Sequence, residues 1–318
     1  MPVTEKKPHV VLGSGPAGTT LAAELASRGH SVRLVNRSGT GEALEGVVRA
    51  AGDVSTVEGA TEAIRGAGTV YHCVNVAYHL QVDHLPQVQR AVLGAAESAG
   101  ARLVVLDTTY PYGETHGEIM TERTPWRATG RKGRMRAELD EIYLAAHREG
   151  RVRTVLGRAA DFVGPRVLIS TLGVATFPAA LTGGEAVSLG DVDLPHSFTD
   201  IRSVAAGLAT LGERPEGDGR VWHLPTAPAL TVREIHAMIE ERTGQPLKTR
   251  TLSEPKPFGP FDEMFMESYA ELFYQHTEGQ TMDSTAIRES FGLEPVPMEE
   301  TLDATLDWYR GFLARTQD

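Results

Sequence analysis

The sequence predicts an α/β protein with a doubly wound parallel sheet, followed by a smaller, mixed C-terminal domain. Two observations carry this prediction. Apolar strand-like runs alternate with helical patterns through the first half of the chain, which is typical of parallel βαβ units. A glycine-rich turn joins the first of these strands to the first helix. After Pro165 the alternation gives way to irregular segments punctuated by proline and glycine.

The alternating elements can be assigned in order. We expect strands at His9–Leu12, Val32–Val35, Val47–Ala50, Val70–Val74, Leu103–Leu106 and Val152–Arg158, and helices at Ala17–Arg28, Val57–Arg65, Leu85–Ala99 and Arg134–Arg148. Ligands of such sheets bind outside the carboxyl ends of the strands. The candidate ligand contacts there are Asp53, Val54, Val74, Asn75 and the segment Thr108 to Tyr112.

The domain organisation follows from the change of pattern. We expect a dinucleotide-binding domain over residues 1–165, with returning segments from about 196–230, and a substrate-binding or lid domain over residues 166–318. In the second part we expect helices at Leu172–Leu181 and Leu302–Leu313, a strand at Ala186–Leu189 and a loop at Glu254–Phe261. Thr231 and Glu234 have the spacing of a capping box before a helix that ends at Arg242.

The glycine-rich turn reads Val-Val-Leu-Gly-Ser-Gly-Pro-Ala-Gly over residues 10–18. In a Rossmann dinucleotide site the first glycine permits a tight turn, the second lets the backbone approach the pyrophosphate, and the third lets helix and strand pack closely. Free amides at the helix N-terminus then face the phosphates. The candidate contacts are Gly13, Ser14, Gly15, Pro16 and Ala17. The alternative is a nucleotide-free α/β domain with a glycine-rich first turn.

The end of the second strand favours NADP(H) over NAD(H). An acidic residue there would bind the ribose 2′-hydroxyl, but this chain has Asn36 followed by Arg37. An amide does not repel a 2′-phosphate, and a guanidinium can form two charge-assisted hydrogen bonds to it. The alternative for Arg37 is a solvated loop charge.

Composition excludes several kinds of partner. The 318 residues include 42 acidic and 31 basic side chains, and a net charge of −11 argues against nucleic acid or an anionic membrane surface. The sequence shows no signal peptide, no membrane-spanning run and no metal-ligand spacing, so we expect a cytoplasmic protein without a metal. The single cysteine, Cys73, lies in an apolar run and is expected to be buried.

Several motifs together resemble the extended short-chain dehydrogenase/reductases, in an atypical NAD-dependent epimerase/dehydratase-like branch. They are the glycine turn, Asp53-Val54, Thr108-Thr109-Tyr110-Pro111-Tyr112-Gly113, Arg158 to Pro165 and His196 to Ile201. The resemblance covers residues from about 8 to about 230, and more weakly the remainder. It implies a nicotinamide cofactor, and it places Asp161 and His196 where the family binds its substrate.

The chain departs from this family at the catalytic residues. The resemblance implies a Ser or Thr, matched by Thr108, and a Tyr-x-x-x-Lys pair on one helical face. No tyrosine here has a lysine four residues later. In the string Ala128-Thr129-Gly130-Arg131-Lys132-Gly133-Arg134, Thr129 or Gly130 replaces the Tyr, and Gly133 or Arg134 replaces the Lys. A usual acidic residue is also missing at Arg202-Ser203.

Other side chains are therefore candidates for the catalytic roles. Tyr110 lies two residues after Thr108, and in an extended segment both would point to the same side. Lys132 and Arg134 could supply positive charge to the cofactor ribose or to an oxyanion. The alternatives are a packing role for Tyr110 and a solvated basic face for the helix start.

Candidate substrate contacts are His79, Tyr112, Asp161 and His196. His79 and His116 lie at the expected crevice, where either could act as a general acid. Tyr112 belongs to a Tyr-Gly pair that is usually structural in the family, so packing is its alternative.

Three functions remain open. The first is an NADP(H)-dependent reductase of a small carbonyl, enone or imine, with Thr108 and Tyr110 donating the proton and orienting the substrate. The second is an epimerase or dehydratase that retains its cofactor, and the third is a non-catalytic NADP(H) sensor. The resemblance also implies a possible homodimer through a four-helix interface, in which Ala91, Ala95 and Ala99 would allow close approach unless they pack on their own sheet.

Overall fold

The computed structural model describes residues 7–316, which divide into two units that the chain visits in turn. The first unit comprises the chain up to Thr108, then Arg134–Arg158 and Val204–Leu224. The second comprises Thr109–Gly133, Ala159–Ser203 and the chain from Pro225 onward. The chain thus enters the second unit for the second time after residue 158, and it returns to the first unit over residues 204–224.

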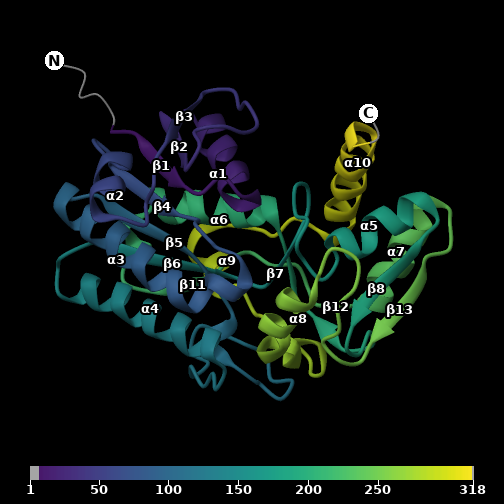
Figure 1. The fold of residues 1–318 in the computed structure, drawn as a ribbon. Coiled ribbons are helices and arrows are strands. Elements are labelled where there is room, and N and C mark those ends of the chain that lie inside the picture. Colours follow the sequence, from purple (N-terminus) through teal and green to yellow (C-terminus); the bar gives the residue numbers. More distant parts are fainter. Residues whose placement is uncertain (1–6, 317–318) are drawn as a thin grey trace. The chain divides into compact units, whose positions relative to one another are not determined.

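The first unit is built on a seven-stranded parallel sheet with the order β11-β6-β5-β4-β1-β2-β3 (Figure 1). The strands are β1 (His9–Leu12), β2 (Val32–Asn36), β3 (Val47–Ala51), β4 (Thr69–His72), β5 (Arg102–Thr108), β6 (Thr154–Ala159) and β11 (Val221–His223). From β1 the chain adds β2 and β3 on one side. It then returns to the other side of β1, where it adds β4, β5, β6 and β11 in turn. The topological switch point, where such sheets bind ligands, therefore lies between β1 and β4.

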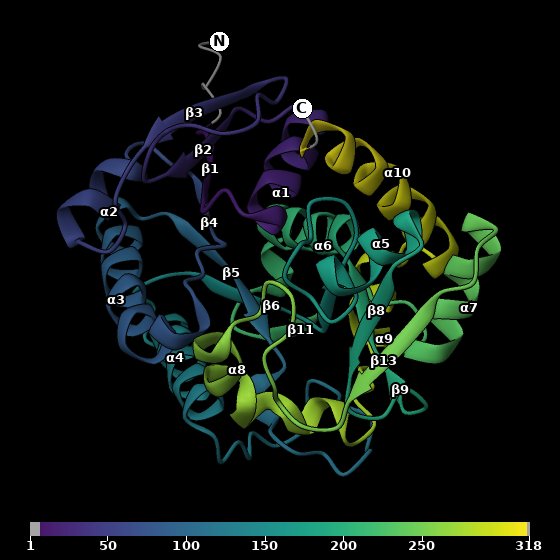
Figure 2. The ribbon, with the colours of Figure 1, turned by 45° about the vertical axis from the view of Figure 1, so that its right-hand side comes forward.

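Helices cover both faces of this sheet, as the doubly wound prediction requires (Figure 2). On one face lie α2 (Val57–Ala63), α3 (Gln81–Ala99) and α4 (Arg131–Arg148); on the other lie α1 (Pro16–Ser27) and α6 (Ile201–Glu213). Alternate strand residues explain the two layers, because Val10 and Leu12 join the core under α2 to α4 whereas Val11 does not. Ala91 and Ala95 belong to that core, so these two alanines of α3 pack within the unit.

Most of the expected elements are confirmed, and the differences have local causes. Helix α3 begins four residues early because the 3₁₀ turn η1 (Tyr78–Leu80) runs directly into it, and Pro86 lies inside the helix. Helix α4 begins three residues early, at Arg131. Strand β4 ends at His72, two residues before the expected end. Helix α6 was not assigned from the sequence.

The second unit contains three two-stranded sheets and several helices. The parallel pairs are β7 (Asp161–Val163) with β10 (Phe198–Asp200) and β8 (Glu185–Leu189) with β13 (Lys248–Leu252), and the antiparallel pair is β9 (Pro195–His196) with β12 (Leu230–Thr231). The helices are α5 (Gly173–Thr182), α7 (Val232–Thr243), α8 (Glu263–Tyr269), α9 (Thr285–Phe291) and α10 (Met298–Thr316), with a 3₁₀ segment η4 (Ala270–His276).

The capping box of α7 is confirmed. The Glu234 amide donates to Thr231 Oγ1 at 3.1 Å, and the Thr231 amide donates to Glu234 Oε2 at 2.8 Å. This satisfies two amides that the first turn of a helix otherwise leaves without a partner.

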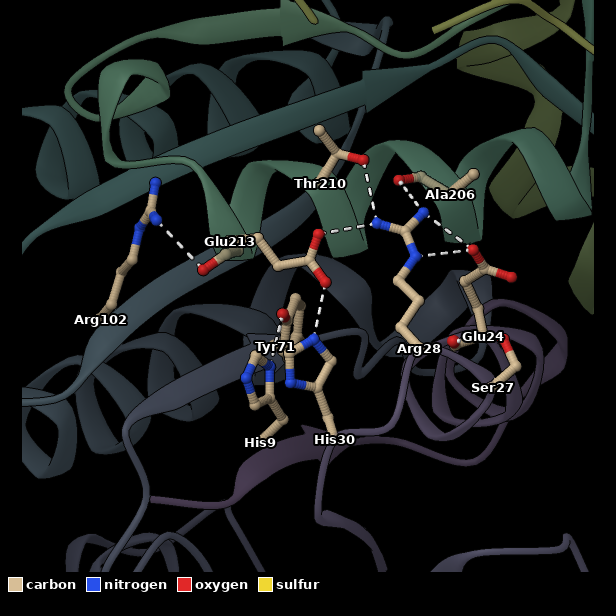
Figure 3. Close-up of polar contacts among 11 residues, drawn as sticks. His9, Glu24, Ser27, Arg28, His30, Tyr71, Arg102, Ala206, Thr210 and Glu213 are labelled. Carbon is tan, nitrogen blue, oxygen red and sulfur yellow. Dashed lines mark hydrogen bonds and ion pairs between the residues drawn. The ribbon is translucent and has the colours of Figure 1, made fainter. Parts of the chain in front are cut away.

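The amino end of the first-unit sheet is closed by a network of charged side chains (Figure 3). Arg28, just past the end of α1, donates to Glu24 at 2.8 Å and to Glu213 of α6 at 2.8 Å. Glu213 also lies 2.7 Å from His30 Nε2. Arg102 donates to the backbone oxygens of Gly212 and Arg214. Together these contacts hold α1 and α6 against the end of the sheet where the strands begin.

Within residues 7–316, no helix combines the length and the apolar character needed to cross a membrane.

Candidate dinucleotide site

The glycine turn has the geometry that the sequence predicts for a pyrophosphate cradle. Gly13 adopts φ 97°, a left-handed conformation that glycine tolerates best, and an added Cβ would lie 2.8 Å from the Cys73 oxygen. A Cβ on Gly18 would lie 1.9 Å from the Gly13 oxygen, so only glycine lets α1 pack this close to β1. Around Gly15, in contrast, a Cβ would meet nothing within 4 Å.

The N-terminus of α1 is open toward the same turn. Gly15 is its N-cap and Pro16 its first residue, and no side chain caps the helix. The amides of the first turn that have no intrahelical partner are therefore available to an anion, which the helix dipole also favours. A dinucleotide pyrophosphate fits this arrangement of residues.

Asn36 at the end of β2 fastens the neighbouring loop. Its Nδ2 donates to Ser14 Oγ and to the Thr40 oxygen, both at 2.7 Å, and its Oδ1 accepts from the Gly39 amide at 2.6 Å. The amide thus joins the glycine turn to the loop after β2, so its contribution to a cofactor site is to shape that loop. Arg37, the next residue, is exposed.

Asp53 and Val54 follow β3. Asp53 Oδ1 accepts from the Ser55 amide at 3.0 Å and from Ser55 Oγ at 2.7 Å. These hydrogen bonds, together with the positive charge of Arg37, lower the pKa of Asp53, which therefore carries a full negative charge near neutral pH. Val54 is buried.

The residues after β4 connect the sheet edge to helix α4. Asn75 is exposed, and its Oδ1 accepts from the Val76 amide at 3.0 Å and from Arg136 Nη2 at 3.3 Å. Val74 is partly buried against the sheet core. His79 lies in η1 with an exposed ring, while His116 lies in the second unit, 3.6 Å from Glu278.

Thr108 and Tyr110 lie where β5 ends, but the segment is not extended as predicted. Thr108 is the last strand residue, and Tyr110–Tyr112 form the 3₁₀ turn η2. The argument from alternating side chains therefore does not apply to this pair, because it requires strand geometry. Within residues 7–316 the buried Thr108 Oγ1 has no hydrogen-bond partner. Tyr110 is 8% exposed.

Tyr112 has the surroundings of a packing residue, which is the alternative stated for its Tyr-Gly pair. It is 1% exposed and contacts a small apolar cluster that includes Met120, Met282 and Trp126.

Lys132, at the start of α4, has a structural role. Its ammonium has three donors, and they meet the Ser268 oxygen at 2.5 Å, Ser268 Oγ at 2.9 Å and Glu271 Oε1 at 3.1 Å. Because all three donors are used and the side chain is 3% exposed, Lys132 fastens this helix start to α8 and η4 within the second unit. Arg134 is exposed.

A buried group of charged side chains lies beneath the carboxyl end of the first-unit sheet, and the sequence analysis missed it. Arg158 of β6 donates to Asp107 Oδ2 of β5 at 2.6 Å and to Asp140 Oδ2 of α4 at 2.7 Å. Arg136 and His72 complete the group, which we call the charge cluster. Four of its residues, His72, Asp107, Arg136 and Asp140, line a cavity of about 10 Å³, room for about one water molecule. The signal in the sequence that could have revealed this group is the presence of charged residues inside otherwise apolar strands.

The pKa values of the charge cluster are strongly shifted. Burial and the adjacent Asp107 carboxyl raise the pKa of Asp140 well above its usual range, against the lowering effect of Arg158. Burial and the charge of Arg136 lower the pKa of His72 to about 4. Asp140 therefore loses its proton less readily than an ordinary aspartate, and His72 is neutral near pH 7.

The second unit brings Asp161 and His196 together. Asp161 Oδ2 lies 3.1 Å from His196 Nε2 and accepts from Thr171 Oγ1 at 2.9 Å. Burial alone would raise the pKa of Asp161, but its hydrogen bond with His196 and the imidazole charges outweigh burial and lower it. The His196 ring stacks on His276, 5.9 Å between centroids, and His276 Nε2 meets the Tyr269 hydroxyl at 2.7 Å. These groups can hold and exchange protons.

Within the described residues, no three His, Cys, Asp or Glu side chains are placed to hold a metal ion.

A strand, a glycine turn and an uncapped helix at the centre of a doubly wound parallel sheet define a dinucleotide-binding domain of the Rossmann type. The model of the NAD-dependent epimerase/dehydratase family matches residues 10–224, so the chain belongs to that family. Comparison with curated proteins finds no match.

Solved structures of similar fold agree with this assignment. MoeE5 in complex with UDP-glucose and NAD is 20% identical, covering 96% of this chain and 99% of its own, with a TM-score of 0.77. UDP-glucose 4-epimerase from Thermotoga maritima is 18% identical, covering 96% and 99%, with a TM-score of 0.80. The dTDP-glucose 4,6-dehydratase DesIV from Streptomyces venezuelae is 19% identical, covering 95% and 96%, with a TM-score of 0.76. The likeness is one of fold, and family membership supports an enzymatic role in general.

Proposed function

We propose that this chain is an oxidoreductase that binds NADP(H) and reduces a small carbonyl, enone or imine in the cytoplasm. The observation that carries the proposal is the glycine turn, with open space beside Gly15 and an uncapped α1. The exposed Arg37 and the absence of an acidic side chain at Asn36 support a 2′-phosphate rather than a free ribose hydroxyl.

The residues of this chain would divide the remaining work. Gly13 to Ala17 would hold the pyrophosphate, and Arg37 the 2′-phosphate. Bound there, a nicotinamide supplies or accepts a hydride. The buried Thr108 hydroxyl, which no described residue satisfies, would orient a substrate oxygen or nitrogen, and Tyr110 would donate the proton. An electrophilic substrate such as an iminium or enone makes the missing Tyr-Lys pair easier to tolerate.

The comparisons support a second candidate, an epimerase or dehydratase that retains its cofactor. The structures of MoeE5 and DesIV both contain NAD, and both fold like this chain. Such a reaction needs a strong base to begin, and Lys132, the only lysine near the usual position, is fully engaged with Ser268 and Glu271.

The first test is a fluorescence titration with NADPH and NADH. We expect tighter binding of NADPH, and we expect Arg37→Ala to weaken it about tenfold or more while NADH binding changes little, because a charge-assisted pair is lost. Arg65→Ala is the control, since Arg65 is exposed and follows α2 at the opposite end of the sheet. Equal loss for both nucleotides would contradict the 2′-phosphate assignment, and no binding of either would contradict the site itself.

The second test measures turnover on a panel of ketones, enones and cyclic imines. We expect Thr108→Val and Tyr110→Phe each to lower kcat about a hundredfold while nucleotide affinity stays within about twofold, as for loss of a proton donor or an orienting hydroxyl. Thr69→Val, a buried threonine at the amino end of β4, is the matched control. Nucleotide released in stoichiometric amount on denaturation, without net NADPH consumption, would favour the epimerase or dehydratase instead.

A further inference from the structure

Arg136 is a buried cation that its surroundings do not fully satisfy. Arg136 is only 8% exposed. Its single hydrogen bond to a described side chain is long, with Nη2 donating to Asn75 Oδ1 at 3.3 Å. Its Nε has no hydrogen-bond partner within residues 7–316. Arginine is almost never buried unless its charge is paired, and the one partner here is a neutral amide, so this position calls for a functional reason.

The neighbouring carboxyl groups are committed to the other arginine of the charge cluster. Arg158 binds both Asp107 and Asp140. Burial and the charge of Arg136 lower the pKa of His72 to about 4, so this imidazole is neutral near pH 7. Within residues 7–316 no ion pair joins Arg136 to a carboxyl group, so its buried charge is not neutralised by direct contact.

The position of Arg136 points this charge toward one half of the crevice. Asn75, its partner, follows β4, and β4 pairs with β1 across the topological switch point. The glycine turn after β1 would hold the pyrophosphate, and the loop after β2 would hold the adenosine ribose, so the nicotinamide half lies on the β4 side.

We propose that Arg136 makes the site prefer the reduced form of the dinucleotide. An oxidised nicotinamide ring carries a positive charge and a reduced ring carries none, so a buried cation at the β4 edge disfavours the oxidised form selectively. Arg136 acts as a positioning residue through Asn75 and through its charge, without touching the reacting atoms. The inference rests on the proposed function, and it favours reduction over a cycle that starts from a retained oxidised cofactor.

The test compares dissociation constants for NADPH and NADP⁺ by calorimetry. We expect the wild-type protein to bind NADPH more tightly, and Arg136→Gln to reduce this preference about tenfold, the effect of one charge at an effective dielectric of about 20 and a distance of about 12 Å. Arg136→Lys keeps the charge and should keep the preference even if both affinities fall. Arg148→Gln, an exposed site at the far end of α4, is the control.

If Arg136 had a purely structural role, Arg136→Gln would weaken the binding of NADPH and NADP⁺ equally and leave the ratio of their dissociation constants unchanged. That result would overturn the inference while leaving the proposed function intact. If the wild type binds neither form, the proposed function fails first. Should Arg136→Gln not fold, the exposed Asn75 offers a second route. Asn75→Asp would neutralise the guanidinium and shift the preference toward NADP⁺, whereas Asn75→Ala would not; equal ratios in these two variants would also overturn the inference.

Discussion

The two ends of the first-unit sheet handle charge in opposite ways. At the amino end, Arg28 and Glu213 lie near the surface, and each meets more than one partner of opposite charge or polarity (Figure 3). At the carboxyl end, Asp140 and Arg158 are almost fully buried, and Arg136 Nε and Thr108 Oγ1 find no partner among residues 7–316. Arg102 Nε at the amino end also lacks a partner within the described residues, so unsatisfied atoms do not separate the two ends. The difference is the depth of the ion pairs, which are partly exposed around Arg28 at the amino end and almost fully buried around Arg158 at the carboxyl end.

The largest effect is expected from Arg158→Met. This change leaves Asp107 and Asp140 buried together without their shared cation, so we expect the free energy of unfolding to fall by about 3–5 kcal/mol. Urea denaturation measures it, with Arg148→Met as the exposed control. A loss below about 1 kcal/mol would mean that the charge cluster contributes little to stability.

Of the two ends of the first-unit sheet, the carboxyl end should contribute more to the pH dependence of stability. Burial and Arg136 lower the pKa of His72 to about 4 in the folded state, against an ordinary value of 6.5. The unfolded chain therefore takes up this proton first, so the contribution is complete above pH 6.5 and is lost as the pH falls toward 4. The expected loss is about 3 kcal/mol at pH 4.

His72→Gln removes this titration, and its unfolding free energy should fall less between pH 6.5 and pH 4 than that of the wild type. At the amino end, burial also lowers the pKa of His9 to about 4, but His9 is only partly buried, so His9→Gln should flatten the profile less. If His9→Gln flattened the pH profile more than His72→Gln, the expected difference between the two ends would be contradicted.

The smallest effect is expected from Arg28→Ala at the amino end. Its ion pairs are partly exposed, with 25% of the Arg28 side chain accessible, so we expect a loss of about 1 kcal/mol in chemical denaturation. Affinity for NADPH should stay within about twofold, because this network closes the edge opposite the proposed site. A tenfold loss of affinity would show that the two ends are coupled.

The fold could be predicted because its signals are local. Strand β1 occupies the expected residues His9–Leu12, and the glycine turn after it has the predicted backbone, since each signal depends on neighbours within a few residues. The capping box at Thr231 was predictable for the same reason.

The parts that could not be predicted depend on distant residues. Helix α4 begins at Arg131 although glycines flank that start, because Ser268 and Glu271, more than 130 residues away, hold Lys132 in place. The charge cluster likewise joins Asp107, Asp140 and Arg158, and none of the three has a neighbour in sequence that reveals the others. The segment after Thr108 becomes a 3₁₀ turn through Pro111 and Gly113, signals that the assumption of extended backbone ignored.

The interleaved path of the chain has a consequence for its synthesis. The first unit needs β6 and β11, and β11 emerges from the ribosome only after residues 159–203 of the second unit have been made. A nascent chain stopped before Thr154 would hold Asp107 and Asp140 without their cation and would present an unpaired sheet edge at β5. Neither unit can therefore mature early as an independent product of translation, and a single cut in the gene cannot release one of them intact.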